Sequence, residues 1–126
     1  MKTGYAIFAH GSKVEGANES VRTLARRFAQ AGPFDLVEPC FLELAEPDLP
    51  AAVAALAGRG ASEVIVLPYF LTFGRHLAED LPRLSEQVRA CFPWLSVRVA
   101  PPLDGHPALL DILVERARAV QEEANR

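Results

Sequence analysis

Strand and helix patterns alternate four times along this chain, and this alternation restricts the fold more than any other feature of the sequence. Apolar runs typical of strands lie at 5–9, 36–42, 64–67 and 95–99, and apolar residues at helical spacing follow each run. A helix between two strands carries the chain back across the sheet, so the next strand starts in the same direction. We therefore expect an α/β fold built on a four-stranded parallel sheet with helices on both faces.

The burial expected for each strand predicts the strand order. The runs at 5–9 and 64–67 are continuously apolar, which is typical of central strands covered on both faces. Pro39 lies inside the second strand and lacks an N–H donor, which favours an edge position. Ser96 and Arg98 give the fourth strand a polar face, which also favours an edge. The resulting order, 2-1-3-4, is a flavodoxin-like arrangement in which ligands bind between the carboxyl ends of strands one and three.

Capping residues, glycines and prolines mark the helix boundaries. We expect the first helix to begin near Asn18 and the second to be capped by Asp48. The third helix should begin between 76 and 80, and the last should open at His106–Pro107. The last helix has an apolar face that we expect to pack on the core, formed by Leu109, Leu110, Leu113, Ala117 and Val120.

Composition and charge exclude several classes of protein. The 126 residues are half hydrophobic and fit one domain, 1–126. A net charge of -3 provides no basic patch for nucleic acid. The N-terminal apolar run is too short for a signal peptide and no stretch reaches membrane-spanning length, so we expect a cytoplasmic protein without a membrane partner. Cys40 and Cys91 match no metal-binding spacing and are expected to be buried free thiols.

Three residues with useful chemistry follow three of the expected strands. His10 comes directly after the first strand, Glu43 follows the second, and His76 ends the loop after the third. The predicted topology brings these residues to one crevice. Two imidazoles and one carboxylate suit a borderline divalent metal such as Co²⁺, Fe²⁺, Ni²⁺ or Zn²⁺. Simpler alternatives remain open, namely a turn histidine beside the flexible Gly11 and a carboxylate that caps the next turn.

Several common catalytic motifs are absent from the sequence. The chain has no P-loop, no dinucleotide-binding glycine fingerprint after the first strand and no helical H-E-x-x-H zinc motif. Ser12 does not lie in a G-x-S-x-G elbow, which argues against a nucleophilic serine. The sequence therefore favours chemistry that needs neither nucleotide nor covalent catalysis.

A set of short motifs extends along nearly the whole chain. They are Ala9–Ser12, Phe41–Pro47, Pro68–Leu71, Gly74–His76, Glu79–Pro82, Pro101–Leu103 and His106–Pro107. In order and spacing these motifs resemble the class II tetrapyrrole chelatases, and within them the short sirohydrochlorin cobaltochelatases. Long members of that family carry two similar halves, whereas this chain supplies one domain of that kind.

The resemblance implies ATP-independent insertion of Co²⁺, or of Fe²⁺ in the siroheme branch, into sirohydrochlorin during cobalamin or siroheme biosynthesis. Cobalt is the first expectation, and no cofactor beyond the substrate metal ion is implied. By position, His10 and His76 would bind the metal and handle protons, and Glu43 would be a third ligand or the proton acceptor. Histidine suits both tasks because its unperturbed pKa is roughly 6.5.

The resemblance also assigns a substrate-binding surface. The macrocycle is a large apolar disc edged by carboxylates, so its site needs an apolar wall and a few cations at the rim. The residues assigned to this surface are Ser12, Lys13, Tyr69, Phe70, Leu71, Phe73 and Arg75. The loop after the third strand supplies the wall, while Lys13 and Arg75 supply the rim, although both also fit ordinary surface charges. His106 likewise fits an ordinary helix boundary.

Two other functions compete with metal insertion. The first is a protein of the same fold that carries metal or tetrapyrrole and catalyses nothing. The second is a flavodoxin-like flavin protein, which would need a phosphate-binding loop after the first strand, where 10–13 offers only a fragment of one.

Assembly follows from the size of the substrate. One sheet edge offers one wall to a planar macrocycle that must be buried on both faces. The loop 69–73 is also too apolar to remain bare. We therefore expect a homodimer with the cleft between the two carboxyl edges.

Overall fold

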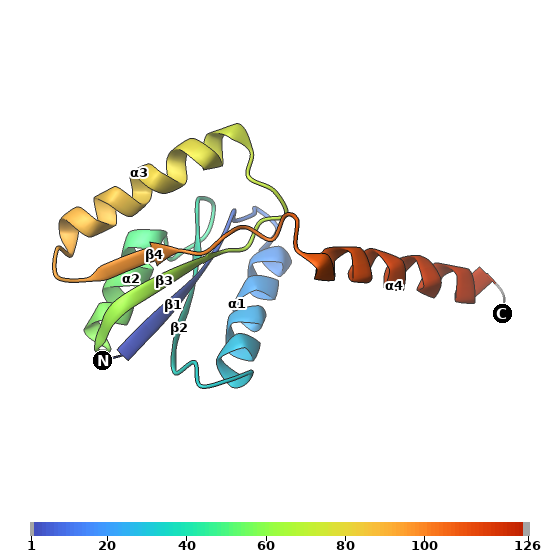
Figure 1. Cartoon of the computed structure of the whole chain (residues 1–126), viewed down its shortest axis with the longest axis horizontal. Coiled ribbons are helices and arrows are strands. Elements are labelled where there is room, and N and C mark those ends of the chain that lie inside the picture. The colour runs from blue at the N-terminus through green and yellow to red at the C-terminus, as the bar shows by residue number, and fades with distance from the viewer. Residues whose placement is uncertain (1, 125–126) are drawn as a thin grey trace.

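The computed structural model describes residues 2–124, in which strands and helices alternate strictly (Figure 1). The elements are β1 (Lys2–Ala9), α1 (Glu15–Gln30), β2 (Leu36–Phe41), α2 (Leu49–Gly58), β3 (Ala61–Pro68), α3 (Arg75–Cys91), β4 (Ser96–Val99) and α4 (Pro107–Ala124). The four strands form one parallel sheet in the order β2-β1-β3-β4. The α/β class and the predicted strand order are confirmed.

Burial and hydrogen-bonding capacity explain the positions of the strands. β1 and β3 are central, and their side chains Ala6, Phe8, Val64 and Val66 are fully buried. β2 pairs with β1 alone, so Pro39 lies in an edge strand. A strand with one neighbour needs backbone donors on one side only, and the missing N–H of proline is tolerated there. β4 is the other edge and exposes Arg98.

Helices cover both faces of the sheet, as the sequence predicts. α2 and α3 share one face and close the larger core, while α1 lies on the other face against β1 and β2 (Figure 1). The α1 face is held by Val21 and Ala25, which pack with Ile7, Ala9 and Phe41. None of the helices within residues 2–124 is long and apolar enough to cross a membrane.

α2 is positioned by its cap and its buried side. The Asp48 side chain accepts a hydrogen bond of 3.0 Å from the backbone N–H of Ala51, as predicted from the sequence. Leu49, Val53 and Leu56 are almost completely buried in the larger core. The helix therefore fixes the end of the loop that leaves β2.

Two helices begin earlier than predicted. α1 begins at Glu15 rather than near Asn18, because the Asn18 amide binds the preceding loop from inside the helix instead of capping its start. α3 begins at Arg75, just before the predicted range 76–80, and continues through Pro82. Pro82 has no backbone N–H, so one carbonyl group in the preceding turn loses its helical hydrogen bond. This part of the helix is exposed, and water can bind that carbonyl instead.

The prediction that the last helix faces the core is wrong. α4 leaves the carboxyl edge of the sheet and runs away from it (Figure 1). Between Pro107 and Glu123 every side chain is exposed except the half-buried Leu109. Before α4, the N–H of Ala100 donates to the carbonyl oxygen of Val66 (2.9 Å), so the pairing of β3 and β4 continues to the point where the chain leaves the sheet.

One of the two cysteines also differs from expectation. Cys40 is fully buried, and burial raises the pKa of its thiol. Cys91 is exposed, because it is the last residue of α3 and lies beyond the part of that helix that packs on the sheet. Both are free thiols.

Candidate functional site

The loops after β1 and β2 bring a histidine and a glutamate together. His10 Nε2 lies 3.7 Å from Glu43 Oε1, and both side chains are more than half exposed. The imidazole Nδ1 also lies 3.1 Å from the carbonyl oxygen of Gly11. Two of the three residues predicted from strand ends are thus neighbours at the carboxyl edge of the sheet.

Main-chain contacts hold the two loops against each other. The N–H of Leu42 donates to the carbonyl oxygen of Ala9 (2.9 Å), and the N–H of Glu43 donates to the carbonyl oxygen of His10 (3.1 Å). These bonds extend the strand pairing beyond the ends of β1 and β2. Gly11 has a φ of 92°, and a methyl group at its Cα would collide with the Glu43 carbonyl oxygen. Glycine is therefore required for His10 and Glu43 to meet.

A buried asparagine clamps the loop that carries His10. Ser12 N–H donates to Asn18 Oδ1 (2.9 Å), and Asn18 Nδ2 donates to the Ser12 carbonyl (2.8 Å). The Ser12 hydroxyl accepts from the N–H of Val14 (3.0 Å). Asn18 is only 2% exposed, so this clamp is shielded from water.

These contacts show Ser12 holding its own loop, whereas the sequence assigns Ser12 to substrate binding. The sequence analysis missed the part played by Asn18. The available signal was an amide side chain a few residues after the histidine and glycine.

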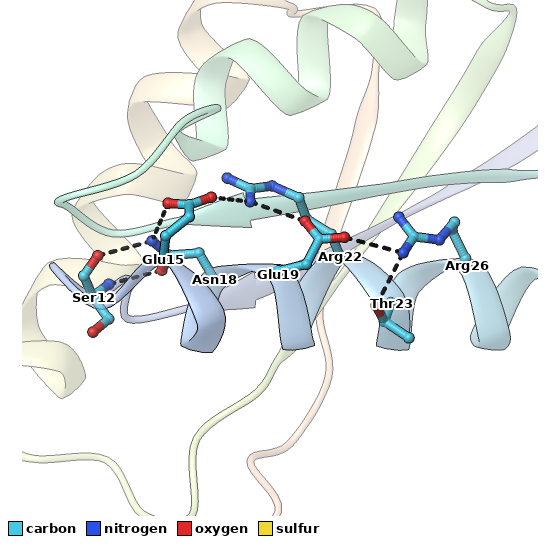
Figure 2. Close-up of polar contacts among 7 residues, drawn as sticks. All are labelled: Ser12, Glu15, Asn18, Glu19, Arg22, Thr23 and Arg26. Carbon is cyan, nitrogen blue, oxygen red and sulfur yellow. Dashed lines mark hydrogen bonds and ion pairs between the residues drawn. The ribbon is translucent and has the colours of Figure 1, made fainter.

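Charged side chains along α1 support the clamp (Figure 2). Asn18 Nδ2 lies 3.2 Å from a Glu15 carboxylate oxygen, and Glu15 in turn pairs with Arg22. Glu19 pairs with Arg22 and Arg26. The hydrogen bond from Arg22 lowers the pKa of Glu15, and the hydrogen bond from Arg26 lowers that of Glu19. Both carboxylates therefore favour the ionised form that pairs with the arginines.

An aromatic side chain stands beside His10. The Phe70 ring centroid lies 6.5 Å from that of His10 and 5.7 Å from that of the buried Phe8, both edge-on. Phe70 and Phe73 are half-buried against the larger core, which fixes this part of the loop after β3. Their positions give the histidine an apolar neighbour.

The rest of that loop is open. Tyr69 is 44% exposed and Leu71 is 68% exposed. The N–H of Tyr69 donates to Phe8 (2.7 Å), so its backbone continues the sheet while its side chain faces outward. The two side chains supply exposed apolar area near the carboxyl edge.

The remaining site predictions fall at the start of α3 and after Ser12. His76 is the second residue of α3, and its side chain lies outside the described part of the structure. Arg75 is well exposed and pairs with Glu79 at 3.7 Å. Lys13 is exposed. His106 accepts a 3.0 Å hydrogen bond from the N–H of Ala108 through Nδ1, which agrees with the helix-boundary alternative.

The described side chains bring together one imidazole and one carboxylate rather than a larger cluster. Among the side chains that the structure describes, no group of three or more His, Cys, Asp or Glu lies close enough to hold a metal ion. Glu43 also borders a depression of about 700 Å³ formed by the loop from Leu42 to Asp48. An open imidazole and carboxylate can take a divalent cation from solution, release it again and accept protons.

Comparison with known proteins identifies the family. The model of the CbiX family matches residues 4–120. The chain belongs to the CbiX family. This membership confirms the resemblance drawn from the motifs.

Two relatives are similar to this chain at moderate sequence identity. A chloroplastic sirohydrochlorin ferrochelatase of Arabidopsis thaliana is 34% identical over 113 residues, which are 90% of this chain and 50% of the relative. The chain therefore spans half the length of that relative. A sirohydrochlorin cobaltochelatase of Sulfolobus acidocaldarius is 31% identical over 114 residues, 90% of this chain and 89% of the relative.

Solved structures share the fold of this CbiX-family chain. A CbiX protein from Marinobacter aquaeolei, described as a putative cobalamin biosynthesis protein, superposes with a TM-score of 0.85 at 28% identity, covering 97% of this chain and 99% of the other. SirB from Bacillus subtilis with Fe³⁺ superposes with a TM-score of 0.74 at 25% identity, covering 81% of this chain and 40% of SirB.

Proposed function

We propose that this CbiX-family protein is a sirohydrochlorin chelatase, which inserts Co²⁺ or Fe²⁺ into the tetrapyrrole without ATP. The observation that carries the proposal is the exposed His10–Glu43 pair beside Phe70 at the carboxyl edge of the sheet. Family membership agrees with it, since relatives of this chain are named for both metals. Cobalt is the metal to test first, because the relatives of similar length are named cobaltochelatases.

The proposed reaction is a balanced exchange. One divalent ion enters the macrocycle and two pyrrole N–H protons leave it, so no electron is transferred and no nucleotide is needed. In this scheme His10 and Glu43 bind the incoming ion, with His76 as the third ligand. As the ion passes to the pyrrole nitrogens, the freed imidazole and carboxylate accept protons. In this scheme only a few exposed side chains hold the substrate metal, and this permits its release.

The proposed substrate site uses the loops around this pair. Phe70 supplies a fixed apolar contact, and Tyr69 and Leu71 supply exposed apolar area for the flat ring. Lys13 and Arg75 are the cations proposed for the carboxylates at the edge of the macrocycle. Each is exposed, so each can turn toward a ligand without losing a buried contact.

We further propose that the chain forms one chelatase-like domain, 1–126, and works in the cytoplasm as a homodimer. The length of these relatives supports the homodimer, because the chain matches half of the Arabidopsis protein and 40% of SirB. A second copy would supply the other half of the site. The proposed partners are a tetrapyrrole and a divalent metal, without nucleic acid or membrane.

A turnover assay tests the proposed function. Sirohydrochlorin with Co²⁺ should change the macrocycle's absorption at a rate proportional to protein concentration and should continue well beyond one equivalent. His10→Ala should slow insertion roughly 100-fold, since loss of a ligand and proton acceptor removes an effect of that order. Glu43→Gln should slow insertion more than it weakens tetrapyrrole binding.

The control for this assay is His106→Ala, which removes a histidine that caps α4 and should leave the rate nearly unchanged. A change that stops after one equivalent would instead identify a carrier of metal or tetrapyrrole. Normal turnover of His10→Ala at subsaturating Co²⁺ would remove the pair from the mechanism.

A further inference from the structure

A groove lies between α3 and the carboxyl end of β4. Its volume is about 340 Å³, which is within the range of small-molecule sites. Phe73 and Leu81 line it on the side of α3, and Val99, which is 37% exposed, lines it on the side of β4. We call this cavity the α3 groove. Its described lining includes neither His10 nor Glu43, so the groove is separate from the candidate metal site.

A buried hydroxyl group without a partner belongs to the lining of the α3 groove. Ser85 is 2% exposed and lines the groove. Among the residues that the structure describes, its Oγ is the one buried side-chain nitrogen or oxygen without a hydrogen bond. A buried hydroxyl that forms no hydrogen bond costs free energy. A molecule bound in the groove could supply the missing partner.

An arginine lines the same groove one helical turn after Ser85. Arg89 lies four residues further along α3, so the two side chains share one side of the helix. Arg89 Nη2 donates to the carbonyl oxygen of Val97 (2.8 Å), and Nη1 donates to Glu86 (2.9 Å). These bonds hold the guanidinium in place, and it has more N–H donors than they use. The polar end of the groove therefore offers donors to an acceptor group.

Water alone is a poor occupant of the α3 groove. A water molecule would satisfy the Ser85 hydroxyl, but it takes up only about 30 Å³ of liquid. The apolar side chains of Phe73, Leu81 and Val99 would then still face solvent. A molecule with an apolar body and an acceptor at one end covers these side chains and satisfies the hydroxyl together.

We propose that the α3 groove binds a small apolar carboxylate, such as a short fatty acid. The carboxylate accepts hydrogen bonds from the Ser85 hydroxyl and the Arg89 guanidinium, and the apolar chain lies along Leu81 toward Phe73. An anionic head is favoured because Arg89 is a cation. Glu86 pairs with Arg89 but is 75% exposed, so water screens its repulsion of a second carboxylate.

The groove ends behind the aromatic side chains of the loop after β3. The Phe73 ring centroid lies 6.3 Å from that of Phe70, and Phe70 in turn stands between Phe73 and His10. A tetrapyrrole also carries carboxylates, so the groove could hold one arm of the macrocycle instead of a separate molecule. The proposal commits to a separate molecule and does not rest on the proposed function.

Calorimetric titration of the full chain with octanoate tests the proposed ligand class. We expect saturable binding of one molecule per chain. Octanol has the same chain without the charge, and acetate has the same head without the chain. Each should bind at least tenfold more weakly, because octanol loses charge-assisted hydrogen bonds and acetate loses the buried chain. Absence of octanoate binding, or equal affinity for octanol or acetate, would overturn the proposal.

Variants of α3 locate the bound molecule. Ser85→Ala and Arg89→Met should each weaken octanoate binding about tenfold or more, since each removes a donor to the carboxylate. Arg83→Met is the matched control, because Arg83 is an exposed arginine of the same helix that pairs with Asp80 and does not line the groove. It should bind octanoate like the wild type. An equal loss of binding in Arg83→Met would place the ligand elsewhere.

Stability gives a readout that a merely structural role of Ser85 would not produce. Ser85→Ala should raise the Tm of the ligand-free protein, because it removes a buried hydroxyl without a partner and alanine is the better helix former. A lower Tm would show that the hydroxyl has a partner within the chain and would overturn its assignment to a ligand.

Cobalt insertion separates the α3 groove from a tetrapyrrole subsite. Ser85→Ala and Arg89→Met should insert Co²⁺ at the wild-type rate. A rate reduced in both, with Arg83→Met unaffected, would assign the groove to an arm of the macrocycle and overturn a separate ligand. The octanoate titration requires no turnover, so a wild-type chain that inserts no metal would count against the proposed function alone.

Discussion

Single residues fix the position of the site through their backbone requirements. Gly11 lets two loops touch, and Asn18 satisfies both backbone groups of Ser12. The sequence predicts that His10 and Glu43 lie together, since strand order alone brings them to one edge. It does not predict the role of Asn18, because a buried amide acquires its partners only when the loop has its final conformation.

Replacing Gly11 with alanine should damage both stability and metal binding. The added methyl collides with the Glu43 carbonyl, and the backbone at this position has a φ that disfavours any side chain. We expect the free energy of unfolding to fall by about 1–3 kcal/mol and Co²⁺ to bind more weakly. Urea unfolding and a cobalt titration measure the two effects.

Gly16→Ala is the matched control. Gly16 lies in α1 with open space around its Cα, so alanine there should stabilise the helix by about 0.5–1 kcal/mol and leave cobalt binding unchanged. Equal behaviour of the two variants would contradict the close approach of the loops.

At the scale of elements, apolar patterns predict helices well and their partners poorly. The strand order could be predicted from the sequence for two reasons. Pro39 lacks a backbone donor, which indicates an edge strand, and the continuously apolar runs indicate strands that are buried on both faces. The apolar side of α4 is equally clear in the sequence. A periodic pattern shows that a helix has a face to cover, however, and not which surface covers it. The expected core position of α4 was wrong for this reason.

The cap of α2 provides a test at this scale. Asp48→Ala should lower the free energy of unfolding by about 1 kcal/mol, because it removes the acceptor for the Ala51 N–H in a helix whose inner side is buried. Asp48→Asn keeps an oxygen acceptor at the same place and should retain most of the stability. Denaturant midpoints of the three proteins decide the matter, and an equal loss in both variants would argue for charge rather than capping.

At the scale of the whole molecule, the candidate site lies open at the carboxyl edge of a single sheet. The His10 and Glu43 side chains are exposed, and the loop after β3 and α4 both extend beyond the carboxyl edge (Figure 1). The size of the proposed substrate leads the sequence analysis to expect a homodimer, but the sequence could not predict which residues of two copies meet, because contacts between copies leave no periodic signal in a single chain. The expected homodimer stays a prediction.

If the two copies share a site, activity should depend on protein concentration. We expect the rate of cobalt insertion per chain to fall on dilution, in the same range in which sedimentation shows the dimer dissociating. A constant rate per chain across dissociation would show that each copy works alone.

The bonds between the strand-end loops have a consequence for how this protein can change over evolution. The main-chain N–H groups of Leu42 and Glu43 donate to the carbonyl oxygens of Ala9 and His10, so neither the His10 nor the Glu43 side chain holds these loops together. Under the proposed function, substitutions at positions 10 and 43 should therefore alter metal preference with little effect on folding. A lineage, or an engineer, can exchange imidazole, carboxylate or thiol at these two positions while Gly11 and Asn18 keep the architecture constant.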